Sequence, residues 1–271
     1  MILQHNITSM NANRQLGIVG KNLAKATEKL SSGYKINRAA DDAAGLSISE
    51  KMRSQIRGLK RASANAQDGI SLIQTAEGAM EQQHAVLQRA RELVVQASNT
   101  ATLHSSSGDF KKIQDELDQL KEEFNSIRST TQFNKKTLLD GTFSKQYLQV
   151  GANSSQGITF TISVAVWNGV SVTANMTGSA NSLLLGSIDK IIQEVSTQRS
   201  NLGAIQNRLE YRIKVDDNAA ENLQSAESLL RDTDMADEMT KFSKENILQQ
   251  AATSMLAQAN QANQGVTSLL G

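Results

Sequence analysis

Apolar residues recur at alternating steps of three and four through most of the C-terminal half, and this repeat constrains the fold more than any other feature. The spacing places one narrow apolar stripe along an α-helix, of the kind that coiled coils bury against a partner. It predicts a helix over 183–231, roughly 70 Å long at about 1.5 Å per residue. Its a and d positions are Ile188, Ile192, Val195, Arg199, Leu202, Gln206, Leu209, Ile213, Asp216, Ala220, Leu223, Glu227 and Leu230.

Shorter repeats of the same kind predict further helices before and after this one. Gly33 follows the first repeat and predicts a left-handed cap, and Asp41 or Asp42 is expected to cap the next helix. The chain contains no proline, whose ring and missing N–H would interrupt such helices. The repeats are Leu16, Val19, Leu23, Ala26 and Leu30; Ile73, Met80, Leu87 and Val94; Ile113, Leu117, Leu120, Phe124 and Ile127; and Leu248, Ala252, Met255 and Ala259.

Three glycines, Gly58, Gly69 and Gly78, lie along the second of these helices. A glycine inside a helix costs about 1 kcal/mol relative to alanine. We therefore expect these positions to be places where a neighbouring backbone approaches closely.

Residues 137–174 change from helical to strand-like patterning. Between 158 and 166 apolar residues occupy every second position, namely Ile158, Phe160, Ile162, Val164 and Val166. Asn168-Gly169 joins this run to VSVT, and Asn-Gly between such runs is the strongest short hairpin signal. Asp140-Gly141 and the stretch YLQVG suggest another hairpin ahead of it. The sequence predicts a small β patch, too short for a catalytic domain.

Together these patterns predict a mainly α fold, a long antiparallel coiled-coil or helical-bundle rod with a small β-hairpin patch and with the termini paired at one end. The terminal repeats are narrow, and isolated helices of this kind are marginally stable in water. We therefore expect the terminal helices to become stable by packing against other chains. The expected segments are an N-terminal terminal helix, outer helices with the β-hairpin region, a long C-terminal helix and a C-terminal terminal helix, at 1–42, 43–182, 183–233 and 234–271.

Composition and motifs exclude several classes of function. Lys and Arg number 28 and Asp and Glu 27, a net charge of +1, whereas proteins that bind nucleic acid or anionic membranes by charge carry a large basic excess. The absence of cysteine excludes disulfides, thiolate zinc sites and a cysteine nucleophile. The first residues lack an apolar stretch of the length that a secretory signal needs, and the sequence has no membrane-spanning run. Taken alone, these two observations predict a cytosolic protein.

No sequence motif indicates an enzyme or a cofactor. Glycine-rich nucleotide loops, zinc-protease motifs and nucleophile elbows are all missing. Glu81 and His84 form one E-x-x-H step, but bundle di-iron sites use two such steps with two further carboxylates, so a solvated helix face is predicted. Asp232, Asp234 and Asp237 lack the glycine and closing glutamate of a calcium loop and are expected to cap a helix.

Two other groups of residues have an ordinary structural interpretation. Met52, Met80, Met235, Met239 and Met255 fall mostly at apolar helical positions and are predicted to fill gaps in the core. The charged residues Arg89, Arg91 and Glu92 flank the apolar repeat and could form a solvated face with an i,i+3 pair between Arg89 and Glu92.

Long motifs in both halves closely resemble those of bacterial flagellin. In the N-terminal half they are LSSGYKINRAADDAAGLSISEKMRSQIRGL, NAQDGISLIQTAEGAM, LQRARELVVQASNT and QFNKKTLLDG. In the C-terminal half they are AIQNRLEYRI, AENLQSAESLLRDTDMADEM and ILQQAATSMLAQANQ. The resemblance covers roughly 1–141 and 183–271. The short segment between them resembles only the β-hairpin part of the family core, so a large variable outer domain is expected to be absent.

The resemblance implies a structural protein that self-assembles into the flagellar filament used for motility. The terminal helices would form the inner filament core, and the longer helices the outer core. Implied partners are other flagellin subunits, the flagellar type III export apparatus and its chaperone, the filament cap and the hook-associated proteins. The implied location is secreted, in the extracellular bacterial flagellum, which would replace the cytosolic expectation. The competing class is a binding module, a secreted coiled-coil ligand that acts as a monomer, and a hook–filament junction protein is a milder alternative.

The resemblance also implies two sets of site residues. Recognition by the flagellin-sensing Toll-like receptor of vertebrates is expected at Leu87, Gln88, Arg89, Arg91, Glu92 and Leu93, with Glu116 on the facing helix. Packing between subunits is expected at Leu16, Val19, Leu23, Leu30, Leu248, Ala252 and Met255. The final stretch NQGVTSLLG departs from the family, many members of which end with a proline-containing stretch and L-L-R.

Overall fold

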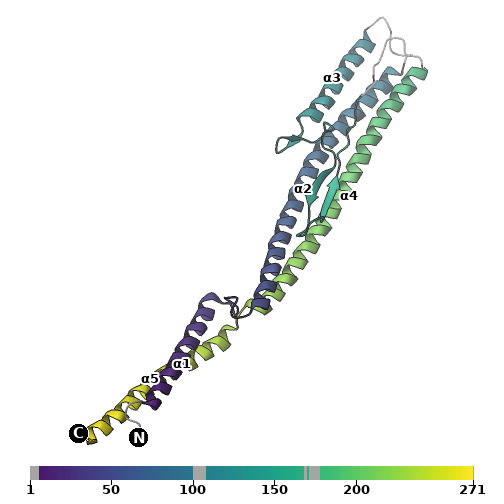
Figure 1. Ribbon diagram of the computed structural model, residues 1–271. Coiled ribbons are helices and arrows are strands. Elements are labelled where there is room, and N and C mark those ends of the chain that lie inside the picture. The colour runs from purple at the N-terminus through teal and green to yellow at the C-terminus, as the bar shows by residue number, and fades with distance from the viewer. Residues whose placement is uncertain (1–5, 100–107, 168–169, 171–177, 271) are drawn as a thin grey trace. The chain divides into compact units, whose positions relative to one another are not determined.

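The computed structural model describes residues 6–99, 108–167, 170 and 178–270, and within these ranges it contains five helices and two two-stranded sheets (Figure 1). The chain divides into two compact units. The first unit joins the two ends of the chain, residues 1–54 and 221–271, and the second comprises residues 55–220. The helices are α1 (Ile7–Ser32), α2 (Ala43–Ala97), α3 (Asp109–Thr130), α4 (Gly178–Arg231) and α5 (Met235–Leu270).

Each of the expected helices is present, and the mainly α fold is confirmed. Within the second unit, α2, α3 and α4 lie side by side (Figure 1). Ile73, Met80, Leu87 and Val94 of α2 are at most 3% exposed, as their seven-residue spacing predicts. The stripes of α3 and α4 face the same core, so the three helices bury their apolar residues against one another.

The segment between α3 and α4 forms part of this core. Phe124 of α3 meets Trp167 edge to face, with ring centroids 5.6 Å apart. The strands are short and pair as two antiparallel hairpins. In the first hairpin, Asn134 and Lys135 both have positive φ, as a two-residue type I′ turn requires. The strands are β1 (Gln132–Phe133), β2 (Lys136–Thr137), β3 (Gln146–Gln149) and β4 (Gly157–Phe160).

The predicted strand over 158–166 is correct only for its first part. β4 ends at Phe160, because β3, its ladder partner, begins at Gln146. Beyond Ile162 the alternation changes phase, so Val166 is exposed while Ala165 and Trp167 are buried. The predicted turn at 168–169 and most of the run that follows it lie outside the described residues.

Asp140 organises the loop between the two hairpins. Its carboxylate accepts hydrogen bonds from the Thr137 hydroxyl and from the backbone N–H and hydroxyl of Thr142, the latter two at 2.9 and 2.7 Å. These hydrogen bonds, foremost the one from Thr137, lower the pKa of Asp140 to about 2. Gly141 follows with a φ of +95°, a conformation that favours glycine.

In the first unit, α1 and α5 pack against each other in antiparallel orientation. At one end of the pair the Asn6 amide donates to the Ala259 carbonyl at 3.0 Å. At the other end the Thr233 N–H donates to the Gly33 carbonyl, also at 3.0 Å. Gly33 has a φ of +75° and caps α1 through its N–H to Lys29, as predicted.

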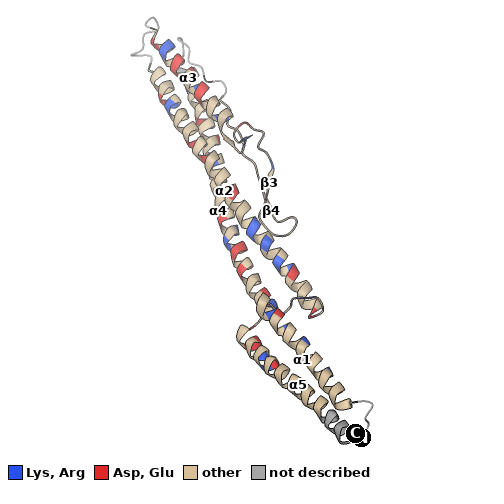
Figure 2. Cartoon of the chain, turned by 90° about the vertical axis from the view of Figure 1, so that its left-hand side faces the viewer, with Lys and Arg blue, Asp and Glu red and all other residues tan. Residues whose placement is uncertain are grey.

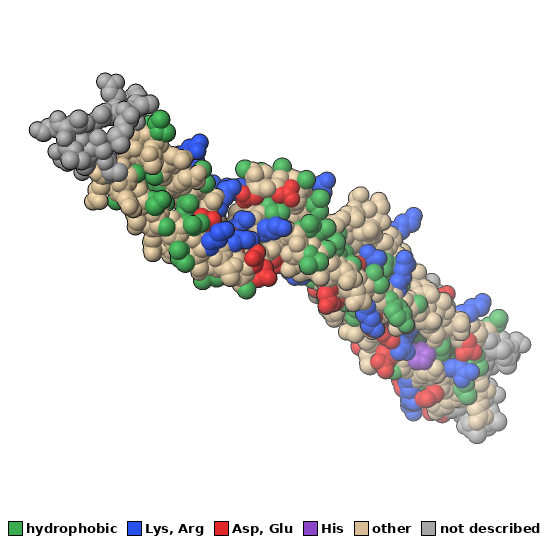
Figure 3. Space-filling view, turned by 90° about the horizontal axis from the view of Figure 1, so that it is seen from below, with side chains coloured by type: hydrophobic (Ala, Val, Ile, Leu, Met, Phe, Trp, Pro, Cys, Tyr) green, Lys and Arg blue, Asp and Glu red, His purple; other side chains and the backbone are tan. Residues whose placement is uncertain are grey.

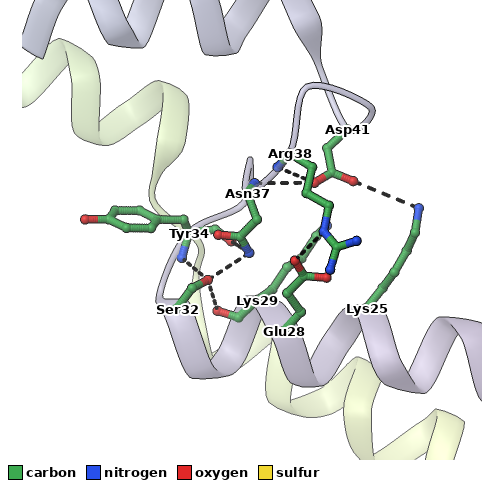
Figure 4. Close-up of polar contacts among 8 residues, drawn as sticks. All are labelled: Lys25, Glu28, Lys29, Ser32, Tyr34, Asn37, Arg38 and Asp41. Atoms are coloured by element: carbon green, nitrogen blue, oxygen red, sulfur yellow. Dashed lines mark hydrogen bonds and ion pairs between the residues drawn. The ribbon is translucent and has the colours of Figure 1, made fainter.

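The loop between α1 and α2 is ordered by polar contacts (Figure 4). The Asp41 carboxylate accepts from the backbone N–H groups of Arg38 and Asn37 at 3.1 and 3.3 Å, and the Arg38 contact is the main reason that the pKa of Asp41 is lowered. Asp42 is the residue that caps α2, accepting from the Gly45 N–H at 2.9 Å. The Arg38 guanidinium donates to Glu28 at 2.8 Å, which joins the loop back to α1.

The same loop is attached to the junction between α4 and α5. The Lys35 N–H donates to the Arg231 carbonyl at 2.6 Å, and Tyr34 forms a short antiparallel bridge with Asp232. The Arg231 guanidinium lies over the Tyr34 ring, 4.6 Å from its centroid. Asp234 caps α5 by accepting from the Ala236 N–H at 2.9 Å, which confirms the capping role predicted for this aspartate. The two inter-helix junctions of the first unit are therefore held together by backbone hydrogen bonds.

Polar residues of the α4 stripe have polar partners, and two of them, Asp216 and Glu227, are buried. The Ser49 hydroxyl donates to Glu227 at 3.0 Å, and Arg199 pairs with Glu77 at 3.7 Å. Asp216 pairs with Arg212 at 3.0 Å, and burial nevertheless raises the pKa of Asp216. The Ser49–Glu227 and Arg199–Glu77 contacts join α2 to α4 and favour one register between them, a use that polar residues have in coiled coils.

Candidate functional site

The paired ends of α1 and α5 carry no charge. The sequence has no Lys, Arg, Asp or Glu over 1–13 or from Asn246 to the C-terminus. Figure 2 shows the described residues of these stretches in tan, the colour of uncharged residues. A helix pair without charges can be buried against another protein without the cost of desolvating ions.

The predicted repeat of α1 faces α5. Leu16, Val19, Leu23 and Leu30 are half-buried, and Ala26 is fully buried. The opposite side of α1 carries Ile7, Met10 and Ile18, which are 65%, 66% and 46% exposed. One stripe of α1 is thus covered within the chain, and a second apolar stripe is left uncovered.

The predicted repeat of α5 is divided between two environments. Ala252 and Ala259 are half-buried, whereas Leu248 and Met255 are exposed, as is Ile247 at 67%. The positions of α5 that are covered follow a different heptad, made of Glu238, Phe242, Glu245, Gln249, Ala252, Leu256 and Ala259. Because this heptad carries polar residues at several positions, Ile247, Leu248 and Met255 remain at the surface, while Phe242 and Leu256 are half-buried.

The prediction that the methionines fill the core is wrong for Met235, Met239 and Met255. All three are 48% exposed or more, since the covered heptad of α5 does not include them. Met80 does lie in the core of the second unit. A groove of about 280 Å³ also runs between the terminal helices, and it is lined by Thr8, Asn11, Ala12, Gln15, Ala252, Met255 and Ala259.

A second candidate surface lies on the second unit, where ion pairs connect α2 to both of its neighbours. The Arg89 guanidinium donates to Glu116 of α3 through Nη2 at 2.8 Å and Nε at 2.9 Å. It also reaches Glu92 at 3.3 Å, which confirms the predicted i,i+3 pair. Arg91 donates to Asp189 of α4 at 2.8 Å, a partner that no sequence motif indicates. Acidic and basic side chains are mixed over the face seen in Figure 3.

These ion pairs are exposed, so they order the surface more than they stabilise the fold. Glu116, followed by Glu92, raises the pKa of the Arg89 guanidinium above its ordinary value. Leu87 and Leu93 belong to the buried core, whereas Gln88, Arg89, Arg91 and Glu92 are exposed. The structure therefore divides the predicted recognition residues into a buried pair and an exposed charged group.

Within the described residues, no three His, Cys, Asp or Glu side chains gather where they could hold a metal ion. His84 contacts Gln88 across one helical turn. Over the same residues, no helix is both long and apolar enough to cross a membrane.

Family comparisons cover nearly the whole chain. The model of the bacterial flagellin N-terminal helical region matches residues 3–144, and that of the C-terminal helical region matches residues 185–270. The chain is 52% identical to a flagellin of Halalkalibacterium halodurans and 47% identical to a flagellin of Bacillus subtilis. Both matches span 100% of this chain and 100% of the relative.

The fold is also similar to that of a solved structure. A putative flagellar hook-associated protein from Vibrio parahaemolyticus superposes with a TM-score of 0.60 over 70% of this chain and 99% of that one. The two sequences are 11% identical, so this likeness concerns the fold alone.

Proposed function

We propose that this chain polymerises through the exposed apolar side chains of its terminal helices. The chain belongs to the bacterial flagellin family and is a structural subunit of the flagellar filament. The filament is extracellular and consists of other flagellin subunits. The observation that carries the proposal is the second apolar stripe, with Ile7, Met10 and Ile18 on α1 and Ile247, Leu248 and Met255 on α5.

The inner and outer stripes of the terminal helices differ in what covers them. Burying apolar surface stabilises by about 25 cal/mol per Å², and the α1–α5 pair already uses its inner stripes in this way. The outer stripes remain in water in a free chain, and patches of this kind mark sites of protein–protein contact. Among the expected packing residues, Leu16, Val19, Leu23 and Leu30 would hold the pair together, while Leu248 and Met255 would contact neighbouring subunits.

We further propose that 1–42 and 234–271 form the inner filament core and that 43–182 and 183–233 form the outer core. The neutral ends of α1 and α5 support this division, since an inner layer is covered by the outer layer and by neighbouring subunits, where charges would have to be desolvated. The charged, partly exposed surfaces of α2, α3 and α4 suit an outer layer.

Assembly is tested with Ile247→Asp and Leu248→Asp. Both side chains are exposed in the free chain, so each variant should keep the helical circular-dichroism spectrum of the unaltered protein. Each places a charge in the proposed contact, at a cost on the order of several kcal/mol, and should therefore abolish growth from filament seeds. Ser243→Asp, at an exposed polar position of the same helix, is the matched control and should polymerise. Normal filaments from both apolar-site variants would contradict the proposal.

A hook–filament junction protein is the alternative, and it predicts a different growth curve. A junction protein would cap or join seeds and then stop, whereas a filament subunit lengthens them as long as monomer remains. The full-length identity to flagellins supports the second behaviour. Filament length measured by electron microscopy against added monomer separates the two.

We also propose that the free subunit is a ligand of the flagellin-sensing Toll-like receptor through Gln88, Arg89, Arg91, Glu92 and Glu116. The exposed ion pairs hold these side chains in defined positions, which lowers the entropy lost on binding. Leu87 and Leu93 are buried and would position this surface from beneath.

Receptor binding is tested with Arg89→Ala. Arginine side chains at the centre of interfaces often carry much of the binding energy, so we expect affinity for the receptor to fall about tenfold or more. Arg208→Ala removes an exposed arginine elsewhere in the same unit and should leave the affinity unchanged. Equal affinities of the two variants in a titration of monomer against the receptor ectodomain would rule out this site.

The remaining partners follow from the family. We propose that the chain is exported unfolded by the flagellar type III apparatus with a chaperone, meets the filament cap and the hook-associated proteins, and serves motility. The sequence supports such a route, because a chain without proline or cysteine refolds without prolyl isomerisation or disulfide exchange.

A further inference from the structure

Five methionines of this protein differ sharply in how far their side chains are exposed to solvent: one is buried and four are exposed. Met80 is 3% exposed in the core of the second unit. Met10, Met235, Met239 and Met255 are 66%, 48%, 49% and 64% exposed, and all four lie in the unit formed by the chain ends. Met235 and Met239 are one helical turn apart at the start of α5, and Met255 lines the groove between α1 and α5.

We propose that Met10, Met235, Met239 and Met255 form an oxidation site that controls whether a free subunit can join a filament. The oxidant is a peroxide, with hydrogen peroxide as the simplest case. The thioether sulfur attacks the peroxide, one oxygen atom is transferred to the sulfur, and water leaves. The sulfur loses two electrons, and the product is a methionine sulfoxide, which methionine sulfoxide reductases can convert back.

The sulfoxide should block assembly because of where these side chains lie. An unoxidised thioether is soft and apolar and can be buried between helices. A sulfoxide presents a strong hydrogen-bond acceptor, and burying it without a donor costs free energy. This step rests on the proposed function, in which the terminal helices are covered by neighbouring subunits. The same covering would protect the sulfurs once a subunit is part of a filament.

The test treats free subunits and finished filaments with hydrogen peroxide and follows each methionine by peptide mass spectrometry, as a mass increase of one oxygen atom. In free subunits the four sites should be oxidised well before Met80, which is the internal reference. In filaments the four sites should be protected. Seeded growth of the treated subunits should be lost in proportion to the sulfoxide formed, and incubation with methionine sulfoxide reductases should restore it.

The matched variant replaces all four methionines with leucine, which is apolar and of similar volume. It should polymerise before peroxide treatment and keep its growth afterwards. Fully oxidised wild-type subunits that still polymerise would overturn the oxidation proposal and leave the assembly surface intact. Equal oxidation of the four sites in filaments and free subunits would instead contradict the assembly surface. If the leucine variant does not fold, repair of oxidised wild-type protein by the reductases decides the matter, because permanent loss of growth contradicts the proposal.

Discussion

Gly58 and Gly78 of α2 have opposite surroundings although both interrupt the same helix. A Cβ added at Gly58 would lie 2.9 Å from the Ala152 Cβ and 3.2 Å from its Cα. A Cβ added at Gly78 would meet no atom within 4 Å. The expectation that these glycines mark close backbone approach is thus correct for Gly58 and wrong for Gly78. At Gly69 the close neighbour is the Leu148 side chain.

This difference predicts opposite effects of alanine at the two positions. Gly78→Ala should raise the free energy of unfolding by about 1 kcal/mol, since alanine favours the helix and touches nothing new. Gly58→Ala gains the same helix propensity but forces the 150–156 loop to move, a strain of about 1–3 kcal/mol. Chemical denaturation of the two variants should therefore place Gly58→Ala below Gly78→Ala by roughly 1–3 kcal/mol.

A second substitution provides the control for this comparison. Ala152→Gly removes the methyl group that the new Cβ would meet, so the double variant Gly58→Ala with Ala152→Gly should recover most of the lost stability. Equal stabilisation by alanine at both glycine positions would show that the loop yields freely.

The helices of the second unit are the elements that the sequence predicts best. Their apolar repeats are buried within one chain, so the positions with the largest apolar residues are also the covered positions, as at Ile73, Leu87 and Val94. The same logic fails for α5, where Glu245 and Gln249 occupy covered positions and Ile247 and Met255 are exposed. A helix with two apolar faces does not reveal in its sequence which face is covered within the chain.

Contacts between elements that are distant in the sequence cannot be predicted from the spacing of residues within one element. The Arg89–Glu92 pair follows from the i,i+3 spacing of a helix. The Arg91–Asp189 pair depends on how α2 and α4 are rotated about their axes, which the spacing within either helix does not determine. Likewise, the change of phase after Ile162 depends on where β3 begins. Sequence patterns thus predicted the elements, and tertiary packing decided which side chains form the candidate sites.

At the scale of the whole molecule, the division into two units predicts that folding and assembly can be separated. The core of the second unit is built from residues between Ala66 and Leu209 and includes none from the chain ends. Removing residues 1–35 deletes all of α1, and removing 240–271 deletes most of α5, but neither truncation removes a member of that core. We therefore expect the second unit of either truncated chain to retain a cooperative thermal unfolding transition. The near-ultraviolet circular-dichroism signal of Trp167, whose ring packs on Phe124, measures this transition.

The same truncated chains should fail to polymerise, because each loses one partner of the α1–α5 pair and the apolar stripe that the partner carries. Seeded growth and sedimentation at increasing concentration measure this loss, and the full-length chain in the same buffer is the control. Loss of both polymerisation and the Trp167 signal would mean that the second unit depends on the chain ends for its folding. Retention of both would place the assembly surface on the second unit, whereas the proposed role of the terminal helices requires that polymerisation is lost and the signal is kept.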